Sequence, residues 1–411
     1  MEQVIPVVKS APVIKPLREK LLLFTLAATQ FINIVDFMIM MPLGPRMMRE
    51  MKIDLTQFGL MVSAYSFSAG ISGFLAAFWL DRFDRKTAMQ ILFTGFLIGT
   101  FACGYANNYI LLTAARIFTG AFAGVMGALV ISIIGDAIPY ERRGTAMGIL
   151  MTSFSAASAL GIPMGLRLAN KFDMWQAPFL VLAGMGVLVW VFISISLPSL
   201  RGHIVAKDER NNPFEILRII SKDGNQLRAL ATTGLMFFGQ FTIIPFLSAY
   251  IVKNAGYPEL DLEYVYISGG IATIIFGPLI GKLADKIGKP KVFIASSILA
   301  AIFGGIYTNL GLTPMYVVII LNSLYMIVGS GRGISSMTMI TGTVKPQHRG
   351  GFMSINTCVQ NLSCASGAYI GGLVVYTNDA GKIVNYNLVG YITVACCLLA
   401  LYFGYRLRVV K

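Results

Sequence analysis

Twelve apolar stretches, each about as long as a bilayer is thick, limit what this chain can fold into. The hydrocarbon core of a membrane is about 30 Å thick, and a helix needs about 20 apolar residues to cross it. The sequence contains twelve such stretches, with boundaries uncertain by about three residues. Their predicted positions are 21–45, 57–80, 88–106, 109–137, 145–166, 175–197, 229–251, 264–281, 292–311, 315–343, 352–376 and 386–405. We therefore expect an all-α membrane protein with twelve transmembrane helices.

The composition excludes a water-soluble protein. Of the 411 residues, 56% are hydrophobic and only 13% are charged, whereas soluble domains carry roughly 25% charged residues. The 33 Lys and Arg residues outnumber the 19 Asp and Glu residues, but they are spread over short loops, which argues against nucleic acid as a partner. The five cysteines lie in apolar stretches and the two histidines are not clustered, so we predict no disulfide framework, no metal site and no cofactor.

The distribution of basic residues predicts which way the spans run. The first stretch follows a basic tail without a small-residue cleavage site, which predicts a retained span rather than a signal peptide. With the N-terminus inside, the inner loops and tails carry 24 Lys and Arg residues and the outer loops carry 7. Because cytoplasmic loops are enriched in these residues, we expect a multi-pass protein with both termini in the cytoplasm. Its short loops suit the bacterial inner membrane.

A long polar stretch after the sixth span divides the chain into two halves. The predicted units are a cytoplasmic tail (1–20), an N-terminal six-helix bundle (21–197), a cytoplasmic linker (198–228), a C-terminal six-helix bundle (229–405) and a second cytoplasmic tail (406–411). Apolar and charged residues alternate within the linker in a way that suits an interfacial helix. A solvated basic linker held near anionic lipid is an alternative interpretation of this segment.

The two halves repeat each other in sequence. An aspartate followed by basic residues stands after the second span and again after the eighth, and Asp81 and Asp285 are 204 residues apart. An Arg-Gly pair follows the fourth span and the tenth, with Arg143 and Arg349 separated by 206 residues. Two six-span repeats are an architecture of secondary transporters.

These motifs resemble those of the major facilitator superfamily. The two loops with Asp81 and Asp285, Arg116 in the fourth span and the run from Asp36 to Leu43 are similar to its twelve-span drug:proton antiporter and sugar-efflux branch. The resemblance covers nearly the whole chain. It implies two six-helix bundles related by pseudo-two-fold symmetry, which alternate access to a central cavity. It also implies an antiporter-type signature, formed by Gly161, Pro163 and Gly165.

The same resemblance implies that the two repeated loops act as gates. Their residues are Asp81, Arg82, Arg85, Lys86, Asp285, Lys286 and Lys289. A carboxylate at one helix end can cap a neighbouring helix and pair with a nearby basic residue, and this pair has to break when the bundles rock. The alternative is a purely topological role, in which the basic residues hold the loops inside. Asp84 stands where a glycine is usual and is expected to stiffen the first loop.

Asp36 and Arg116 are the residues that we expect to couple transport to protons. Asp36 is the only acidic residue well inside a predicted span, where a charge costs at least about 2.5 kcal/mol. At 1.5 Å per residue, Asp36 and Arg116 lie about 14 and 10 Å from the outer side, the same level within boundary error. Protonation of Asp36 would release Arg116 and switch the protein between two states. The alternative is a permanent ion pair that locks the first span to the fourth. Gly120 and Gly124 predict close helix packing beside Arg116.

Polar side chains on one face of several spans predict the wall of a substrate cavity. Arg332 lies about 25 Å from the outer end of its span, too deep to share a level with Asp36. With polar residues at helical spacing in the tenth and eleventh spans, it can hold an anionic or hydroxylated ligand. The alternative is that Arg332 binds backbone carbonyls at the inner mouth. The predicted cavity residues are Asn33, Met40, Gln240, Asn322, Tyr325, Arg332, Asn356 and Gln360.

The charge within the spans narrows the expected substrate. Arg116, Arg332 and Asp36 sum to +1 with the carboxylate ionised and to +2 with it protonated. A small amphipathic compound that is neutral or anionic therefore fits better than a compact cation. We expect a monomeric secondary transporter in contact with membrane lipid, which exports such a compound by alternating access and uses the proton gradient as its energy source.

Two other functions fit parts of the same pattern. Proton-linked uptake, or lipid flipping, of an anionic substrate by the same fold is one alternative. A non-transporting membrane receptor or scaffold is the other, although a scaffold needs no gating loops. An enzyme is not expected, because no nucleophile, base and orienting group can be assembled from the residues within the spans.

Overall fold

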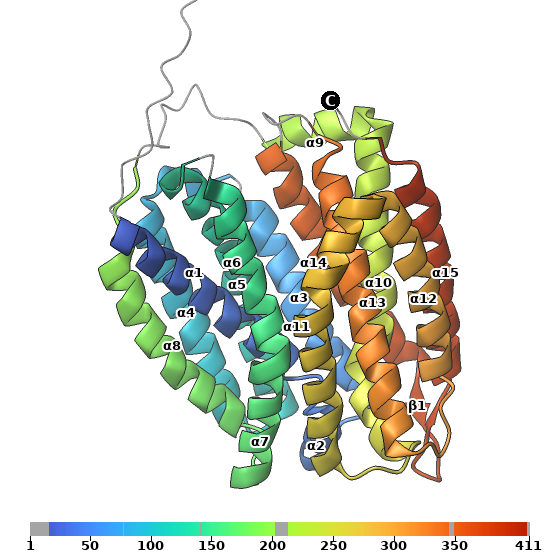
Figure 1. The fold of residues 1–411 in the computed structure, drawn as a ribbon. Helices are drawn as coiled ribbons and strands as arrows, with labels where there is room; N and C mark the ends of the chain where they lie inside the picture. The colour runs from blue at the N-terminus through green and yellow to red at the C-terminus, as the bar shows by residue number, and fades with distance from the viewer. Residues whose placement is uncertain (1–15, 77, 140–141, 202–212, 345–348, 409–411) are drawn as a thin grey trace, which may run out of the picture.

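Two bundles of long helices stand side by side (Figure 1). The structure is a computed structural model and describes residues 16–76, 78–139, 142–201, 213–344 and 349–408. The N-terminal bundle contains α1 (Pro16–Met38), α2 (Gly44–Met51), α3 (Leu55–Ala76), α4 (Arg85–Tyr105), α5 (Tyr109–Ala137), α6 (Arg143–Ala156), α7 (Ile162–Phe172) and α8 (Ala177–Ser196). The C-terminal bundle contains α10 (Gly224–Lys253), α11 (Leu262–Ile287), α12 (Lys289–Tyr307), α13 (Met315–Thr341), α14 (Arg349–Val374) and α15 (Tyr386–Tyr405).

Shorter elements connect or flank these helices. The amphipathic helix α9 (Pro213–Lys222) precedes α10 and lies across one end of the C-terminal bundle (Figure 1). Strands β1 (Tyr376–Thr377) and β2 (Ile383–Val384) pair antiparallel between α14 and α15. Two short 3-10 helices, η1 (Leu80–Arg82) and η5 (Glu259–Asp261), precede α4 and α11.

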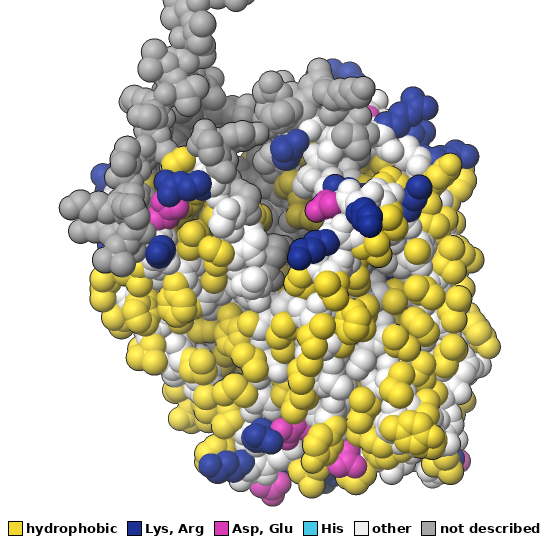
Figure 2. All heavy atoms as spheres, viewed as in Figure 1, with side chains coloured by type: hydrophobic (Ala, Val, Ile, Leu, Met, Phe, Trp, Pro, Cys, Tyr) yellow, Lys and Arg dark blue, Asp and Glu magenta, His cyan; other side chains and the backbone are white. Residues whose placement is uncertain are grey.

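The charged side chains gather at the two ends of the molecule. Figure 2 shows a broad band of hydrophobic side chains across the visible side of the molecule, with Lys, Arg, Asp and Glu above and below it. We call the two ends the α9 end and the α2 end, after the short helix that each carries (Figure 1). An apolar belt between two charged ends is the surface that a bilayer requires.

Within the described residues, eleven helices are long and apolar enough to cross a membrane. They account for every predicted span except the eleventh, which forms α14. α14 is also long, but it carries polar residues such as Asn356 and Gln360 along its length. It packs against α3 and α10. Protein therefore shields part of its polar surface from lipid, which a more apolar helix would not need.

Several predicted boundaries were wrong. The predicted span 21–45 ends early, because α1 stops at Met38 and a turn leads to α2. Pro42 and Pro45 explain the break, since proline lacks a backbone N–H and disfavours a helical conformation in the residue before it. The predicted linker 198–228 also ends early. Asp223 caps α10 by accepting hydrogen bonds from the amides of Asn225 and Gln226, so that helix begins at Gly224.

The predicted tails lie mostly beyond what the structure describes. Of the predicted tail 1–20, residues 1–15 are outside the described part, and α1 already begins at Pro16. Residues 409–411 of the tail 406–411 are also outside it. The predicted linker contains a helix, α9, and its location at the membrane interface stays a prediction.

The fifth predicted span is a helix interrupted by a π-helical turn. α6 ends at Ala156, the π turn η3 covers Ala157–Gly161, and α7 follows from Ile162. Pro163 explains the turn, because its ring nitrogen cannot donate a helical hydrogen bond to the preceding turn. The span therefore contains a local irregularity within the antiporter-type signature.

Two glycines let α5 press against α3. A Cβ atom on Gly120 would lie 2.3 Å from the carbonyl oxygen of Tyr65, and one on Gly124 would lie 2.0 Å from that of Ala69. Only glycine fits at such distances, so the close packing predicted for these residues is confirmed. It also brings Arg116, about one turn before Gly120, next to α3.

The two bundles touch through close approaches of their backbones. Thr56 of α3 donates a hydrogen bond to the carbonyl oxygen of Gly372 in α14 at 2.8 Å. A Cβ atom on Gly59 would lie 2.8 Å from a backbone oxygen of α14, and one on Gly270 of α11 would lie 2.3 Å from the Cα atom of Ala159 in η3. The interface between the bundles therefore pairs α3 with α14 and the fifth span with α11.

Candidate functional site

A buried ion pair joins α1 to α5. Arg116 Nη1 donates to Asp36 Oδ2 at 2.7 Å and to the Asp36 carbonyl oxygen at 3.3 Å. The side chains are 0% exposed for Asp36 and 1% exposed for Arg116. Thr100 of α4 donates to the second carboxylate oxygen at 3.0 Å. The structure thus brings together the two residues that the sequence placed at one level, and adds a hydroxyl from a third helix.

An aromatic stack extends from this ion pair to the other bundle. The Arg116 guanidinium lies 4.1 Å from the ring centre of Tyr65, whose hydroxyl donates to Asn33 Oδ1 at 3.1 Å. The ring of Phe37 stacks on Tyr65 at 5.2 Å and on Phe241 of α10 at 5.6 Å between centroids. Phe37 follows Asp36 in the chain, so the ion pair has a short route of contacts to the C-terminal bundle.

The cluster has the chemistry of a buried ion pair, and a role in proton coupling stays a prediction. A buried pair is stable because each charge compensates for the lost hydration of the other, and removing one partner costs about 3 to 5 kcal/mol. Protonating Asp36 removes one partner without changing the packing volume. The remaining guanidinium would then have the Tyr65 ring and the Asp36 carbonyl oxygen as its neighbours, which would favour a rearrangement.

The predicted cavity residues of the tenth span face the interior of the C-terminal bundle. Asn322 donates to the carbonyl oxygen of Val265 in α11 at 2.7 Å and accepts from the Tyr307 hydroxyl of α12 at 3.3 Å. Tyr325 contacts the same Tyr307 ring edge to face at 6.2 Å. Arg332 is 5% exposed. These neighbours lie on α11 and α12, and a role in substrate binding stays a prediction.

The other predicted cavity residues differ in exposure. Asn356 is buried and accepts a hydrogen bond from Thr233 of α10 at 2.6 Å. Met40 is buried in the turn after α1. Asn33, Gln240 and Gln360 are partly exposed. The structure joins Asn33 to the ion-pair cluster through Tyr65.

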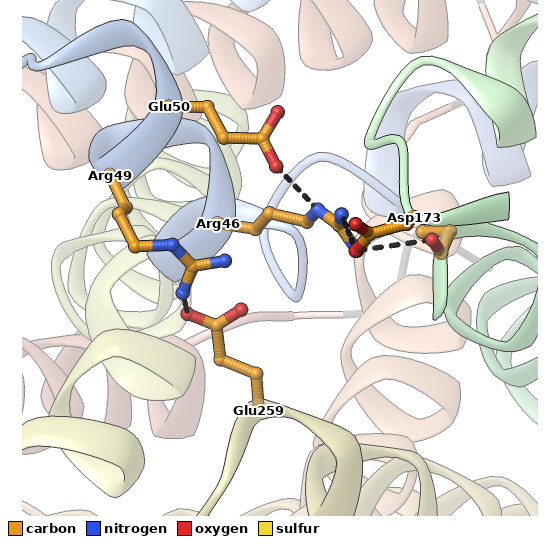
Figure 3. A network of polar contacts seen from close by, with 6 residues as sticks. Arg46, Arg49, Glu50, Asp173 and Glu259 are labelled. Carbon is orange, nitrogen blue, oxygen red and sulfur yellow. Dashed lines mark hydrogen bonds and ion pairs between the residues drawn. The ribbon is translucent and has the colours of Figure 1, made fainter. Parts of the chain in front are cut away.

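A polar network at the α2 end was missed by sequence reasoning (Figure 3). Arg49 of α2 forms an ion pair with Glu259, which precedes α11 in the other bundle. Arg46 binds Glu50 on its own helix at 2.7 Å and Asp173 at the end of α7. The signal was present as basic and acidic residues in loops predicted to share one side of the membrane. Which basic residue pairs with which acidic residue depends on the relative positions of the two bundles, and these cannot be derived from the sequence.

A second ion pair crosses between the bundles at the same end. Arg167 of α7 lies 3.0 Å from Glu263 of α11. Arg46 also donates to the carbonyl oxygen of Ala169 at 3.0 Å, which places a positive charge at the C-terminal end of α7. Together these contacts hold α2 and α7 of one bundle against η5 and α11 of the other.

The predicted gating loops lie at the α9 end. Arg85 forms an ion pair with Asp136 at 2.8 Å, Lys86 donates to the Ser194 carbonyl oxygen at 2.7 Å, and Lys289 pairs with Asp285 at 2.8 Å. Arg82 and Lys286 are exposed. The side chain of Asp81 lies outside the described part. A gating role for these residues stays a prediction.

Asp84 ties the first gating loop to the segment after α8. Its carboxylate accepts hydrogen bonds from the Lys86 amide at 2.9 Å, the Leu200 amide at 3.1 Å, Arg201 Nε at 3.2 Å and the Ser199 hydroxyl. Burial alone would raise the pKa of this carboxyl, but these hydrogen bonds together outweigh burial, so its pKa is lowered. The stiffening expected of Asp84 thus has a physical basis in four contacts.

The antiporter-type signature packs on α1. A Cβ atom on Gly161 would lie 2.2 Å from Val35 Cγ2, and one on Gly165 would lie 2.4 Å from Ile39 Cδ1. Val35 precedes Asp36, so the signature supports the helix that carries the carboxylate. In the described part of the chain, no cluster of three or more His, Cys, Asp or Glu side chains is suited to a metal ion.

Comparison with known families agrees with this architecture. The profile described as Major Facilitator Superfamily matches residues 26–334 and 229–411. The chain belongs to this superfamily. It is therefore a multi-pass membrane transporter that works by alternating access between its two bundles.

Several curated transporters and solved transporter structures are similar to this chain over most of its length. It is 23% identical over 368 residues to the uncharacterized MFS-type transporter YceJ of Bacillus subtilis, which covers 89% of this chain and 92% of that protein. It is 25% identical to the inner membrane transport protein YdhP of Escherichia coli over 60% of this chain and 62% of that protein. Among solved structures, a D-xylose–proton symporter superposes with a TM-score of 0.78 at 15% identity, covering 95% of this chain and all of that one. A bacterial homologue of the human lysosomal transporter Spinster gives 0.72 at 16% identity, covering 95% and 97%.

Proposed function

We propose that this transporter exports a small amphipathic compound in exchange for protons, and that Asp36 is the group that takes up and releases the proton. The observation that carries the proposal is the ion pair of Asp36 with Arg116. It is buried, it joins two helices of one bundle, and stacked rings connect it to the other bundle. A permanent structural pair would not need that connection.

The proposed cycle alternates between a neutral and a charged cluster. While Asp36 is ionised, it holds Arg116 against α1. When Asp36 binds a proton, Arg116 loses its countercharge and the rings of Tyr65 and Phe37 follow its movement. Because Phe37 also contacts Phe241 in the other bundle, this movement changes the relative stability of the two access states. A proton gradient then biases the cycle.

The proposed orientation identifies which side of the membrane is closed. The 24 basic residues assigned to the inside, against 7 outside, favour a cytoplasmic α9 end. The cross-bundle ion pairs Arg49–Glu259 and Arg167–Glu263 would then close the outer side. Exchange rather than co-transport is proposed from the resemblance of Gly161, Pro163 and Gly165 to the antiporter-type signature.

A second candidate is proton-linked uptake of an anionic substrate. The observation that favours it is Arg332, which is buried in the C-terminal bundle without a carboxylate partner among the described residues. An anion that crosses with protons would compensate that charge during the cycle. The same fold performs either reaction, and the direction depends on which steps the proton accelerates.

A ligand screen tests the proposal for either direction of transport. Purified protein is tested by thermal shift against matched cationic, neutral and anionic amphipaths at pH 6 and pH 8, because ligand binding to the folded state raises its stability. Wild type is compared with Asp36→Asn and with Asp379→Asn, an exposed aspartate between β1 and β2. We expect neutral or anionic hits whose pH dependence disappears only in Asp36→Asn. Equal pH dependence in all three proteins would contradict the role of Asp36.

A further inference from the structure

Arg332 has a different environment from Arg116. The charge of Arg116 is compensated by Asp36 at 2.7 Å. The buried side chain of Arg332 has no carboxylate partner among the described residues, and its Nε and Nη2 atoms have no hydrogen-bond partner. The Cys397 thiol is within hydrogen-bonding reach of this guanidinium, but a neutral thiol is only a weak acceptor. An unpaired buried charge is costly, so a compensating anion is expected.

Two buried serines on α12 and α13 also lack partners among the described residues. In the described part of the chain, the buried side-chain atoms without a hydrogen bond belong to Arg116, Arg332, Ser297 and Ser335. Ser335 lies one turn after Arg332 on α13, and Ser297 lies on α12, which packs against α13. Two free hydroxyl donors and two free guanidinium nitrogens are therefore concentrated in one bundle.

Helix geometry places Ser297, Arg332 and Cys397 at one depth, with Ser335 one turn nearer the α9 end. Ser297, Arg332 and Cys397 lie about 12 to 14 Å from the α9 end of their helices, α12, α13 and α15, at 1.5 Å per residue. At this level α12 and α13 are close, because a Cβ atom on Gly331 would lie 2.6 Å from Ser296 Oγ. A Cβ atom on Gly329, one turn from Arg332, would meet no atom within 4 Å, so α13 is not tightly packed at that position.

We propose that the C-terminal bundle binds a small anion of halide or carboxylate size between α12 and α13, held by Arg332, Ser297 and Ser335. The anion accepts hydrogen bonds from the guanidinium and from both hydroxyls. The guanidinium is positively charged and has no acceptor atom, so the site disfavours cations. The site deepens the second candidate function, which already uses Arg332, but it requires no proton coupling and shares no residue with the Asp36 cluster.

The test is an anion titration of the purified full-length transporter. Chloride, bromide, nitrate or acetate replaces the bulky anion lactobionate at constant ionic strength, and the unfolding temperature is recorded. For wild type we expect a saturable increase of about 2 °C or more. The increase is lost in Arg332→Gln and kept in Arg218→Gln, which changes an exposed arginine of α9. A wild-type response that is absent, or the same in Arg332→Gln, would overturn the proposal.

A second variant keeps the test decisive if Arg332→Gln does not fold. Replacing both serines, Ser297→Ala with Ser335→Ala, leaves the charge in place and removes two donors. We expect the half-saturating anion concentration to rise about tenfold or more. An unchanged concentration in the double variant would contradict the assigned site.

A competition experiment identifies the source of the anion. Anionic compounds that stabilise the protein are titrated again in saturating chloride. A reduced response means that the anionic group of the compound occupies the site, and an unchanged response means that the site holds a free inorganic anion. Both results support the site, whereas anionic hits that stabilise Arg332→Gln as well as wild type, together with no halide effect, would exclude it.

Discussion

The ring of Phe37 in α1 stacks on the ring of Phe241 in α10, with 5.6 Å between their centroids, beside the buried carboxylate of Asp36. The residue that directly follows the proposed proton site therefore makes a contact between the two bundles. The same Phe37 ring also stacks on Tyr65, which lies against Arg116. This arrangement connects a local change of charge to the relative position of the bundles.

We expect Phe241→Ala to weaken this connection. Loss of the ring removes about 0.5 to 1.5 kcal/mol of stacking beyond the buried area, so ligand binding remains but depends less on pH. The measurement is the shift of ligand affinity between pH 6 and pH 8. A double-mutant cycle with Phe37→Ala gives the coupling between the rings. Strictly additive effects would mean that the stack does not transmit the change.

The cross-bundle ion pairs at the α2 end are expected to hold that end closed. Glu259→Gln and Glu263→Gln remove the partners of Arg49 and Arg167. Since partly exposed pairs contribute about 0.2 to 1 kcal/mol each, the double variant should raise the open population by a few-fold.

Spin labels give the readout for this change. Lys171 of α7 and Leu260 of η5 are exposed and belong to opposite bundles, so labels there report the opening as a longer distance in pulsed electron paramagnetic resonance. The exchanged pair Arg49→Glu with Glu259→Arg should restore the closed distance. Identical distance distributions in all variants would show that these pairs do not control the α2 end.

The contact of Gly270 with Ala159 predicts a steric effect of one methyl group. A Cβ atom at 270 would lie 2.3 Å from the Ala159 Cα atom, so Gly270→Ala must move α11 away from η3. We expect a loss of about 1 to 3 kcal/mol in the closed state, seen as a lower unfolding temperature. Gly277→Ala on the same helix is the control, since its Cβ atom meets nothing within 4 Å. If both substitutions lowered the unfolding temperature equally, the loss could not be attributed to the contact of Gly270 with Ala159.

Asp84 predicts a loss of stability in acid. Its folded-state pKa is lowered by hydrogen bonds that outweigh burial, so its contribution is fully present above the unfolded pKa of about 3.9 and is lost as the pH falls through the lower folded value. Asp84→Asn should cost about 1 to 3 kcal/mol at pH 7. The difference in the free energy of unfolding between wild type and Asp84→Asn should become smaller below about pH 4. A difference that stays constant as the pH falls through this range would rule out the Asp84 carboxylate as its cause.

The positions of the spans and the level of Asp36 and Arg116 could be predicted from the sequence, because both follow from helix rise and hydrophobic length. The rest of the cluster could not. Thr100 and Tyr65 complete it from α4 and α3, and hydropathy does not fix how those helices rotate about their axes. Phe241 reaches it from the other bundle, whose placement is a tertiary property.

The surroundings of the polar face of the tenth span could not be predicted from the sequence either. Helical periodicity placed Asn322, Tyr325 and Arg332 on one face. Whether such a face looks into a cavity or into its own bundle depends on the neighbouring helices, and here Asn322 and Tyr325 contact α11 and α12. The end of α1 at Met38 could have been predicted in part from Pro42 and Pro45. The apolar residues continue past Met38, however, so hydropathy alone predicted a longer span.

Proton movement in sealed vesicles tests the central claim most directly. The transporter is reconstituted in proteoliposomes that contain a pH-sensitive dye, and a compound that stabilises the purified protein is added as a gradient. For wild type and Asp379→Asn we expect a change of internal pH that follows the compound. For Asp36→Asn we expect the protein to remain folded and to bind the compound without moving protons. Proton movement by Asp36→Asn at the wild-type rate would contradict the assignment of Asp36 as the coupling group.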